Sequence, residues 1–246
     1  YVPGPEDKTA LVRIFQRVEG IPLCIELAAS WMRSLNTTEI VQELDKNIDF
    51  LESTVQDMPK RHRSLRAVFD YSWELLTVRE KQLFRKLSVF SGGFTRDAAE
   101  RVGEASLQSL SLMVDKSLLR RSASGRYEML KVLRQYAAEK LALEPKEKEA
   151  VQDRHCVYYA DSLEGFRELY RSGREEQFLT GIGEDIDNIR SAWLRAIDQG
   201  RDAEINKSLV TLHNFYEMRG WLQEGAELFR IAADSLKKRY TAKPAD

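Results

Sequence analysis

Apolar residues recur along most of this chain at intervals of three and four, the period at which one face of an α-helix repeats. In the first quarter this pattern predicts three helices, over residues 9–18, 23–35 and 39–44. Gly20 ends the first helix, and Pro22 stands where a first helical turn tolerates proline. Thr37 or Thr38 caps the third helix. The pattern therefore predicts a small helical domain over residues 1–56.

Residues 57–143 carry the order of elements that is typical of a winged helix. The segment Thr77-Val78-Arg79-Glu80 is a capping box that starts one helix, and Thr95 caps a second. Further elements follow: a third helix over 107–116, a β-hairpin over 118–121 and 126–129, and a long helix over 130–143. Three helices followed by one hairpin predict a winged-helix domain.

The last segment, residues 144–246, begins with a charged stretch, Glu144 to Glu149, that we expect to be a linker. Single glycines then punctuate five predicted helices, over residues 150–170, 175–181, 185–199, 202–219 and 222–239. Gly181-Ile182-Gly183 is interpreted as one of the turns between them. Such hairpins indicate a tetratricopeptide-like array, with a non-repeat helical bundle as the alternative. The predicted fold class is mainly α.

Composition sharpens this division. The chain has 246 residues, 38 Lys plus Arg and 39 Asp plus Glu, which gives a net charge of −1. With 43% hydrophobic residues it is too apolar for intrinsic disorder. The formal charge is −4 over residues 1–56, +7 over 57–143 and −4 over 144–246. The basic excess is therefore confined to the predicted winged helix.

Residue patterns for catalysis or metal binding are missing from the sequence. There is no GxxxxGK[ST] phosphate loop, and His62, His155 and His213 lie too far apart in sequence for a metal motif. Cys24 and Cys156 have no CxxC partner, so we expect two buried thiols in a reducing compartment. We predict no enzymatic activity, no metal and no cofactor in this chain.

The sequence also lacks targeting signals. No apolar stretch is long enough to cross a bilayer, and the start has neither an initiator Met nor a signal-peptide core. We therefore expect a cytoplasmic protein, of which this chain is an internal part.

Several ordered blocks carry a resemblance to a known family. They are Gly20-Ile21-Pro22-Leu23-Cys24-Ile25-Glu26-Leu27-Ala28-Ala29, Pro59-Lys60-Arg61-His62-Arg63-Ser64-Leu65-Arg66, Leu83 to Phe94, Val114 to Leu119, Leu133 to Ala137 and Asp185 to Ala192. Together they resemble the region after the nucleotide domain of STAND signalling ATPases, most closely bacterial LuxR-type transcriptional regulators. The resemblance covers nearly the whole chain. It implies a helical lid, a winged helix and a tetratricopeptide-like sensor behind an upstream P-loop domain.

The same resemblance implies how the parent protein would hold ATP or ADP. Pro22 belongs to the lid's GxP motif, whose proline packs against adenine, although a proline in a first helical turn explains the residue equally well. The family's Met-His-Asp motif reads Met129-Leu130-Lys131 here, and a leucine cannot donate the hydrogen bond of that histidine to phosphate. Lys131 is the candidate phosphate contact in its place.

Two readings of function follow. In the first, this chain is a non-catalytic regulatory fragment that couples nucleotide state to an effector-binding helical sensor. Its partners would be the upstream P-loop domain, a protein or small-molecule effector, and further copies of the parent. The candidate effector groove comprises Trp193, Phe215, Tyr216 and Trp221, residues whose helical spacing also fits core packing.

The alternative reading is a DNA-binding winged helix with a helical dimerisation domain. Arg120, Arg121 and Arg126 would then contact phosphates from the wing. Against this, the predicted recognition helix over 106–116 has a single cation, Lys116, and few side chains suited to base edges. We therefore expect no DNA binding by this segment.

Overall fold

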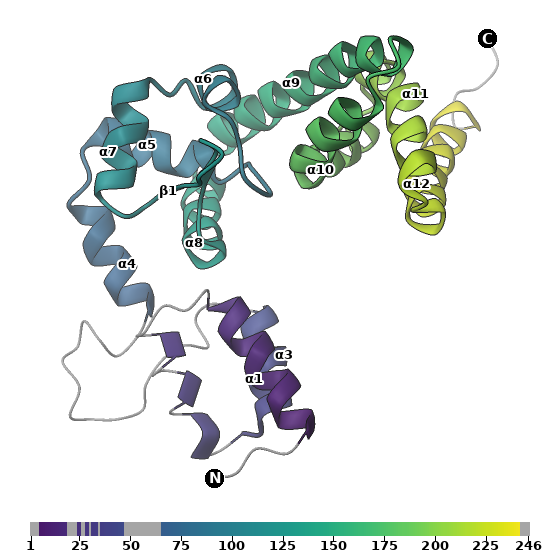
Figure 1. Ribbon diagram of the computed structural model, residues 1–246. Helices are drawn as coiled ribbons and strands as arrows, with labels where there is room; N and C mark the ends of the chain where they lie inside the picture. The colour runs from purple at the N-terminus through teal and green to yellow at the C-terminus, as the bar shows by residue number, and fades with distance from the viewer. Residues whose placement is uncertain are drawn as a thin grey trace. The chain divides into compact units, whose positions relative to one another are not determined.

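The computed structural model describes residues 5–18, 24–25, 28–29, 31–33, 35–46 and 65–241. These residues belong to two compact units, one comprising 1–88, 108–120 and 129–144, the other 89–107, 121–128 and 145–246. Each unit includes part of the predicted winged helix, and the three predicted domain boundaries stay a prediction. The fold is mainly α, with one two-stranded hairpin among the described residues (Figure 1).

In the first unit, α1 (Pro5–Arg17) packs against α3 (Thr37–Lys46), and a short 3₁₀ turn, η1 (Trp31–Arg33), precedes α3. The buried face of α1 does not include its largest apolar side chain. Ala10, Ile14 and Val18 are buried, whereas Phe15 is 58% exposed. Residues four apart lie above one another on a helix, so a single stripe of smaller side chains meets α3.

The predicted cap of α3 was wrong by one residue. The backbone N–H of Glu39 donates to the Asn36 side chain, and the Asn36 N–H donates to the Glu39 carboxylate. This reciprocal pair is a capping box with Asn36 at the N-cap. Thr37 instead donates its hydroxyl to Asp7 of α1.

Most helices of the winged-helix region also lie in the first unit, and they have the predicted order. They are α4 (Leu65–Glu74), α5 (Val78–Leu87), α7 (Leu107–Asp115) and α8 (Lys131–Ala142). The Thr77–Glu80 capping box that begins α5 is confirmed. Both α4 and α5 pack against α8, which buries Phe84, Leu87 and Tyr136.

The second unit joins α6, most of the wing and the helical array. Thr95 caps α6 (Arg96–Gly103) as predicted, and the wing hairpin is formed by β1 (Arg120–Arg121) and β2 (Tyr127–Glu128). Phe94 makes an antiparallel bridge with Tyr127. The array consists of α9 (Pro145–Arg171), α10 (Glu175–Asp198), α11 (Asp202–Arg219) and α12 (Leu222–Thr241).

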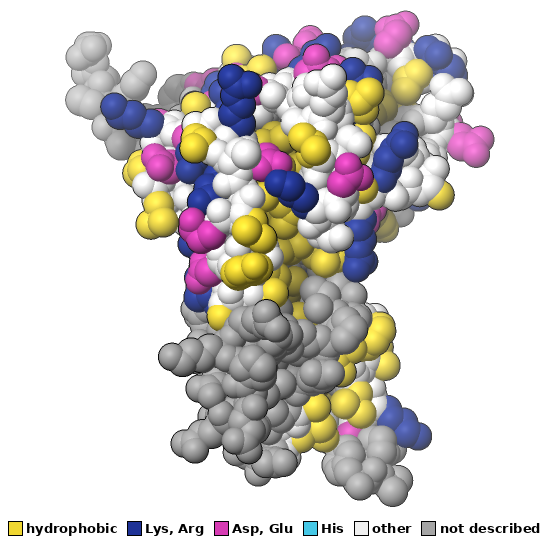
Figure 2. Space-filling view, turned by 90° about the vertical axis from the view of Figure 1, so that its left-hand side faces the viewer, with side chains coloured by type: hydrophobic (Ala, Val, Ile, Leu, Met, Phe, Trp, Pro, Cys, Tyr) yellow, Lys and Arg dark blue, Asp and Glu magenta, His cyan; other side chains and the backbone are white. Residues whose placement is uncertain are grey.

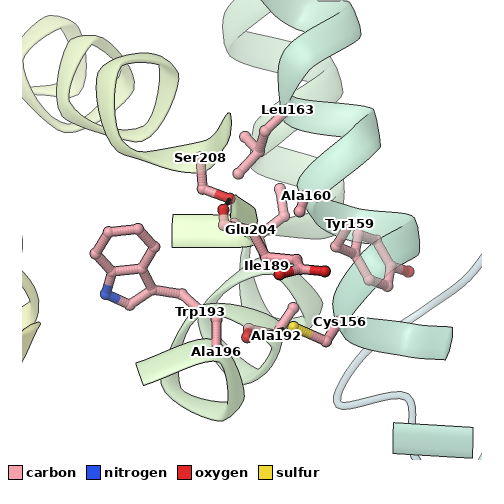
Figure 3. Close-up of a pocket in the computed structure, with 10 residues that line it drawn as sticks. All are labelled: Cys156, Tyr159, Ala160, Leu163, Ile189, Ala192, Trp193, Ala196, Glu204 and Ser208. Carbon is pink, nitrogen blue, oxygen red and sulfur yellow. Dashed lines mark hydrogen bonds between the residues drawn. The ribbon is translucent and has the colours of Figure 1, made fainter. Parts of the chain in front are cut away.

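Within the array, α9 and α10 each pack against the two helices that follow them. Helix α9 contacts α10 and α11, and α12 contacts α10 and α11 (Figure 1). Where α9, α10 and α11 meet, Cys156, Leu163, Ile189 and Trp193 close the junction with essentially no room for a water molecule (Figure 3). This junction is packed core. Cys24 and Cys156 are both buried, as predicted.

Two sequence interpretations in the array were wrong. Residues 144–149 are not a linker, because α9 begins at Pro145, where proline's missing N–H costs nothing. Gly181-Ile182-Gly183 is not a turn and lies inside α10. A β-carbon at Gly181 would overlap the Phe166 ring of α9, so this glycine permits close helix packing.

None of the described helices has the length and apolarity that a membrane crossing requires. No group of His, Cys, Asp and Glu side chains in the same part of the chain is arranged to hold a metal ion.

Candidate coupling site

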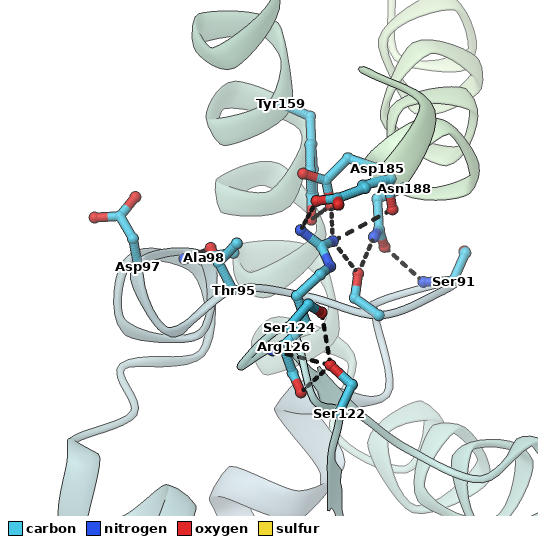
Figure 4. A network of polar contacts seen from close by, with 12 residues as sticks. Ser91, Thr95, Asp97, Ala98, Ser122, Ser124, Arg126, Tyr159, Asp185 and Asn188 are labelled. Carbon is cyan, nitrogen blue, oxygen red and sulfur yellow. Dashed lines mark hydrogen bonds and ion pairs between the residues drawn. The ribbon is translucent and has the colours of Figure 1, made fainter. Parts of the chain in front are cut away.

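Arg126, on the wing, is held by the middle of α10 and by the loop before α6 (Figure 4). Its guanidinium Nη2 donates to the Gly93 carbonyl at 2.8 Å and to Asp185 Oδ1 at 2.5 Å. Glu184 adds a longer ion pair to Nη1, at 3.5 Å. The Arg126 and Asp185 side chains are only 12% and 18% exposed, so solvent screens their attraction weakly.

Asn188, one helical turn after Asp185, fixes the same loop. Its side chain is fully buried. The Nδ2 group donates to the Gly93 carbonyl at 3.0 Å, and Oδ1 accepts the Ser91 N–H at 2.8 Å. We call Ser91, Gly93, Arg126, Asp185 and Asn188 the wing–array joint. These bonds link α10, the wing and the loop before α6 to one another, so the joint fixes the wing on the array.

Aromatic side chains support the joint. Phe90 and Phe94 stack with ring centroids 4.2 Å apart, and Phe94 stacks on Tyr127 of the wing. His155 of α9 lies against Phe90 at 5.5 Å and against Tyr159 at 4.7 Å. Tyr159 in turn donates its hydroxyl to Asp185 at 3.4 Å. The polar joint therefore rests on a packed aromatic cluster.

Burial controls the protonation of this cluster. Desolvation lowers the pKa of His155 to about 4, against the weaker opposing effect of its hydrogen bond with Asn188. The imidazole is 2% exposed, and its Nε2 has no hydrogen-bond partner among the described residues. Burial, followed by the charge of Asp185, raises the pKa of the Tyr159 hydroxyl. Both groups are neutral near pH 7.

Sequence reasoning missed this site. Asp185 is 18% exposed, whereas Asp187, two residues later in α10, is 62% exposed. The usable signal was the Asp185–Asn188 spacing of three, which puts two short polar side chains on one helix face. The identity of their partner, Arg126, has no local signal.

The structure separates the three predicted DNA-contacting arginines. Arg120 and Arg121 are exposed on β1, whereas Arg126 is committed to the joint. Lys116, which directly follows α7, pairs with Glu80 at 2.6 Å. The exposed side chains of α7 are Leu107, Gln108, Ser111, Leu112 and Asp115. The wing thus has two outward arginines, and the exposed surface of α7 has apolar, neutral polar and acidic side chains but no cation.

The predicted effector residues divide in a similar way. Trp193, Phe215 and Tyr216 are at most 2% exposed and belong to the core of the array. Trp221, at the turn between α11 and α12, is 41% exposed and contacts Phe215 with ring centroids 5.9 Å apart. Only Trp221 of the four presents a substantial surface.

The predicted nucleotide contacts are only partly visible. Pro22 and the GxP motif lie outside the described residues, as does the basic run from Pro59 to Ser64. Lys131, the first residue of α8, lines a cavity of about 500 Å³ together with Arg13, Gln16, Arg17 and Val41. Three of these five residues are cationic. The lining gives this cavity a positive charge.

Comparison with known proteins identifies part of the chain. Residues 76–142 match the family described as winged helix-turn-helix domain. Putative HTH-type transcriptional regulators of Mycobacterium bovis and Mycobacterium tuberculosis are 33% identical over 230 residues, which is 89% of this chain and 26% of those proteins. An uncharacterized protein of Mycobacterium bovis is 33% identical over 154 residues, 58% of this chain and 39% of its own length.

A solved structure shows a more distant likeness. It is a Signal Transduction ATPase with Numerous Domains (STAND) protein with a tetratricopeptide repeat sensor from Pyrococcus horikoshii, 18% identical, with a TM-score of 0.35, over 87% of this chain and 39% of that one. The chain spans about a quarter of the length of the mycobacterial regulators. It contains a winged helix-turn-helix domain and is homologous, over most of its length, to putative HTH-type transcriptional regulators.

Proposed function

We propose that this chain is the non-catalytic regulatory part of a cytoplasmic STAND-type transcriptional regulator, and that its winged helix couples an upstream nucleotide-binding domain to the helical array. The observation that carries the proposal is the wing–array joint. A wing held by Arg126, Asp185 and Asn188 moves with α10. A change in the array is thereby passed to the winged helix, as a two-state switch requires.

Two further features support this role. Homology to transcriptional regulators about four times longer than this chain fits a regulatory segment inside a larger protein. The cavity lined by Arg13, Arg17 and Lys131 has the charge to accept a phosphate of ATP or ADP. In that role Lys131 takes the place that the family gives to a histidine.

Hydrogen exchange in the full-length regulator tests the coupling. We expect exchange of α10 backbone amides to differ between ADP-bound and ATP-bound protein, and this difference to vanish in Arg126→Met. Arg230→Met, which removes an exposed α12 ion pair to Glu227, is the matched control and keeps the difference. The proposal is wrong if wild-type α10 exchanges equally in both nucleotide states.

DNA binding by the winged helix is the second candidate. It is favoured by the charge of +7 over residues 57–143 and by the exposed Arg120 and Arg121. Against it, positive and negative side chains are interspersed on the face in Figure 2, and Arg126 is committed to the joint. A mobility shift at several salt concentrations separates the two functions, because phosphate contacts make affinity fall steeply with salt. Tight binding that Arg120→Ala and Arg121→Ala abolish would establish DNA recognition.

A further inference from the structure

The turn between α11 and α12 presents three adjoining residues to solvent. Arg219 ends α11, Gly220 follows in the left-handed conformation with φ of 70°, and Trp221 and Leu222 are 41% and 63% exposed. Two large apolar side chains beside a cation make a compact surface, which we call the turn patch and define as Arg219, Trp221 and Leu222. Single exposed apolar residues are common on protein surfaces and do not by themselves indicate a binding site. The state of the neighbouring cation, Arg219, therefore decides whether the turn patch is a binding site.

Arg219 is held in place without being neutralised. Its Nη2 donates to the Leu179 carbonyl at 3.2 Å, and its guanidinium lies 5.8 Å from the Phe215 ring centroid and 5.9 Å from that of Trp221. A β-carbon at position 183 would lie 3.0 Å from this guanidinium, so Gly183 leaves space for it. No carboxylate of the described residues lies within ion-pair distance of Arg219.

Arg190 provides the contrast within the same turn. Its guanidinium also lies near Trp221, at 5.8 Å from the ring centroid, yet it pairs with Glu224 at 2.5 Å and Asp187 at 3.6 Å. The charge of Arg190 is thus satisfied inside the chain. Of the two arginines at Trp221, only Arg219 is left to attract an external anion.

A protein segment suits this patch better than nucleic acid does. Tryptophan and arginine are the residues most enriched where a few side chains carry most of a protein interface's energy. Because Arg219 is already fixed on two rings, binding would cost little side-chain entropy. Exposed Glu217, two residues before Arg219, disfavours a polyphosphate backbone more strongly than a segment with a single carboxylate, because repulsion grows with the number of negative charges.

We infer that the turn patch binds a protein segment in which a carboxylate stands next to an apolar side chain. The carboxylate pairs with Arg219, and the apolar side chain covers Trp221 and Leu222. The inference rests on the proposed role of the array as the sensor, and it specifies the chemistry of the effector as an acidic, apolar peptide segment.

Binding of short synthetic peptides to the whole chain tests this inference. The probe is a labelled peptide of Glu and Leu, compared with versions carrying Gln or Lys in place of Glu. We expect saturable binding of the Glu peptide only, weakened at least about tenfold by Arg219→Glu and by Trp221→Ala. Arg171→Glu, at an exposed arginine near the end of α9, is the charge-matched control and leaves binding unchanged.

A charge swap makes the test decisive. Arg219→Glu should gain binding of the Lys peptide, a result that a misfolded variant cannot give. The inference is overturned if no peptide binds, if Gln and Glu peptides bind equally, if Arg171→Glu weakens binding as much as Arg219→Glu, or if single-stranded DNA displaces the Glu peptide. Because the coupling test uses nucleotide and no peptide, the inference and the proposed function can fail separately.

Discussion

The wing–array joint and the contact between α4 and α8 are built from the same kinds of groups in very different surroundings. In the joint, the ion-paired Arg126 and Asp185 side chains are 12% and 18% exposed. Between α4 and α8, Arg66 and Glu139 pair at 2.7 Å with side chains 31% and 39% exposed. Water screens the second pair and hardly reaches the first. Burial therefore decides which of two similar contacts holds its partners in place.

Tyr136 is the exception within the α4–α8 contact. It is 1% exposed, and its hydroxyl donates to Asp70 at 2.6 Å, where Lys140 also lies at 3.1 Å. Burial raises the pKa of Asp70, but these two hydrogen bonds and the charges of Lys140 and Arg66 leave it below its ordinary value. The contact thus contains one buried hydrogen bond among partly exposed ion pairs. We expect the cost of losing a polar contact to increase with its burial.

The largest loss should follow Arg126→Met. Removing the guanidinium leaves Asp185 unpaired beside the Gly93 carbonyl, and breaking a buried pair typically costs about 3 to 5 kcal/mol. Chemical denaturation followed by circular dichroism measures the free energy of unfolding. The exposed pair Arg230–Glu227 supplies the control, Arg230→Met. A loss below about 1 kcal/mol for Arg126→Met would mean that the joint resembles a surface contact.

Acidification should weaken the same region through His155. Its pKa is about 4 in the folded chain against 6.5 in an unfolded one, so between these values the unfolded state binds a proton that the folded state does not. The free energy of unfolding therefore falls as pH drops from 6.5 to 4, by roughly 3 kcal/mol in all. Subtracting the pH profile of His155→Gln isolates this contribution, and identical profiles for the two proteins would contradict it.

A smaller effect is expected for Tyr136→Phe. The change removes the hydroxyl donated to Asp70 and keeps the ring contacts with Phe69 and Trp73. Loss of one hydrogen bond should cost about 1 kcal/mol in thermal or chemical unfolding. Asp70→Asn in the Tyr136→Phe background should then remove only the partly exposed ion pair with Lys140 and cost less than about 1 kcal/mol more.

The smallest effect should come from Arg66→Met. The Arg66–Glu139 pair is partly exposed, so its loss should cost less than about 1 kcal/mol, and less still at high salt. Unfolding at low and high salt measures both. A cost equal to that of Arg126→Met would remove the distinction between the buried and the exposed contact.

Local features were predictable from the sequence because their causes lie within a few residues. The Thr77–Glu80 capping box, the Thr95 cap and the wing turn at Gly125, with φ of 82°, depend on neighbouring backbone groups. Helices α11 and α12 were likewise set by the spacing of apolar residues between single glycines. In each case the determining groups are adjacent in the chain.

Only the tertiary structure decided which polar residues form the wing–array joint and which small residues permit close helix packing. Gly181 does not mark a turn but lies inside α10. The Phe166 ring of α9 occupies the space that a β-carbon at this position would fill. Asp185 became a partner of Arg126, 59 positions earlier, because the tertiary fold places the wing against α10. Periodicity shows which face of a helix is apolar, but the partner of a buried charge depends on how distant segments pack.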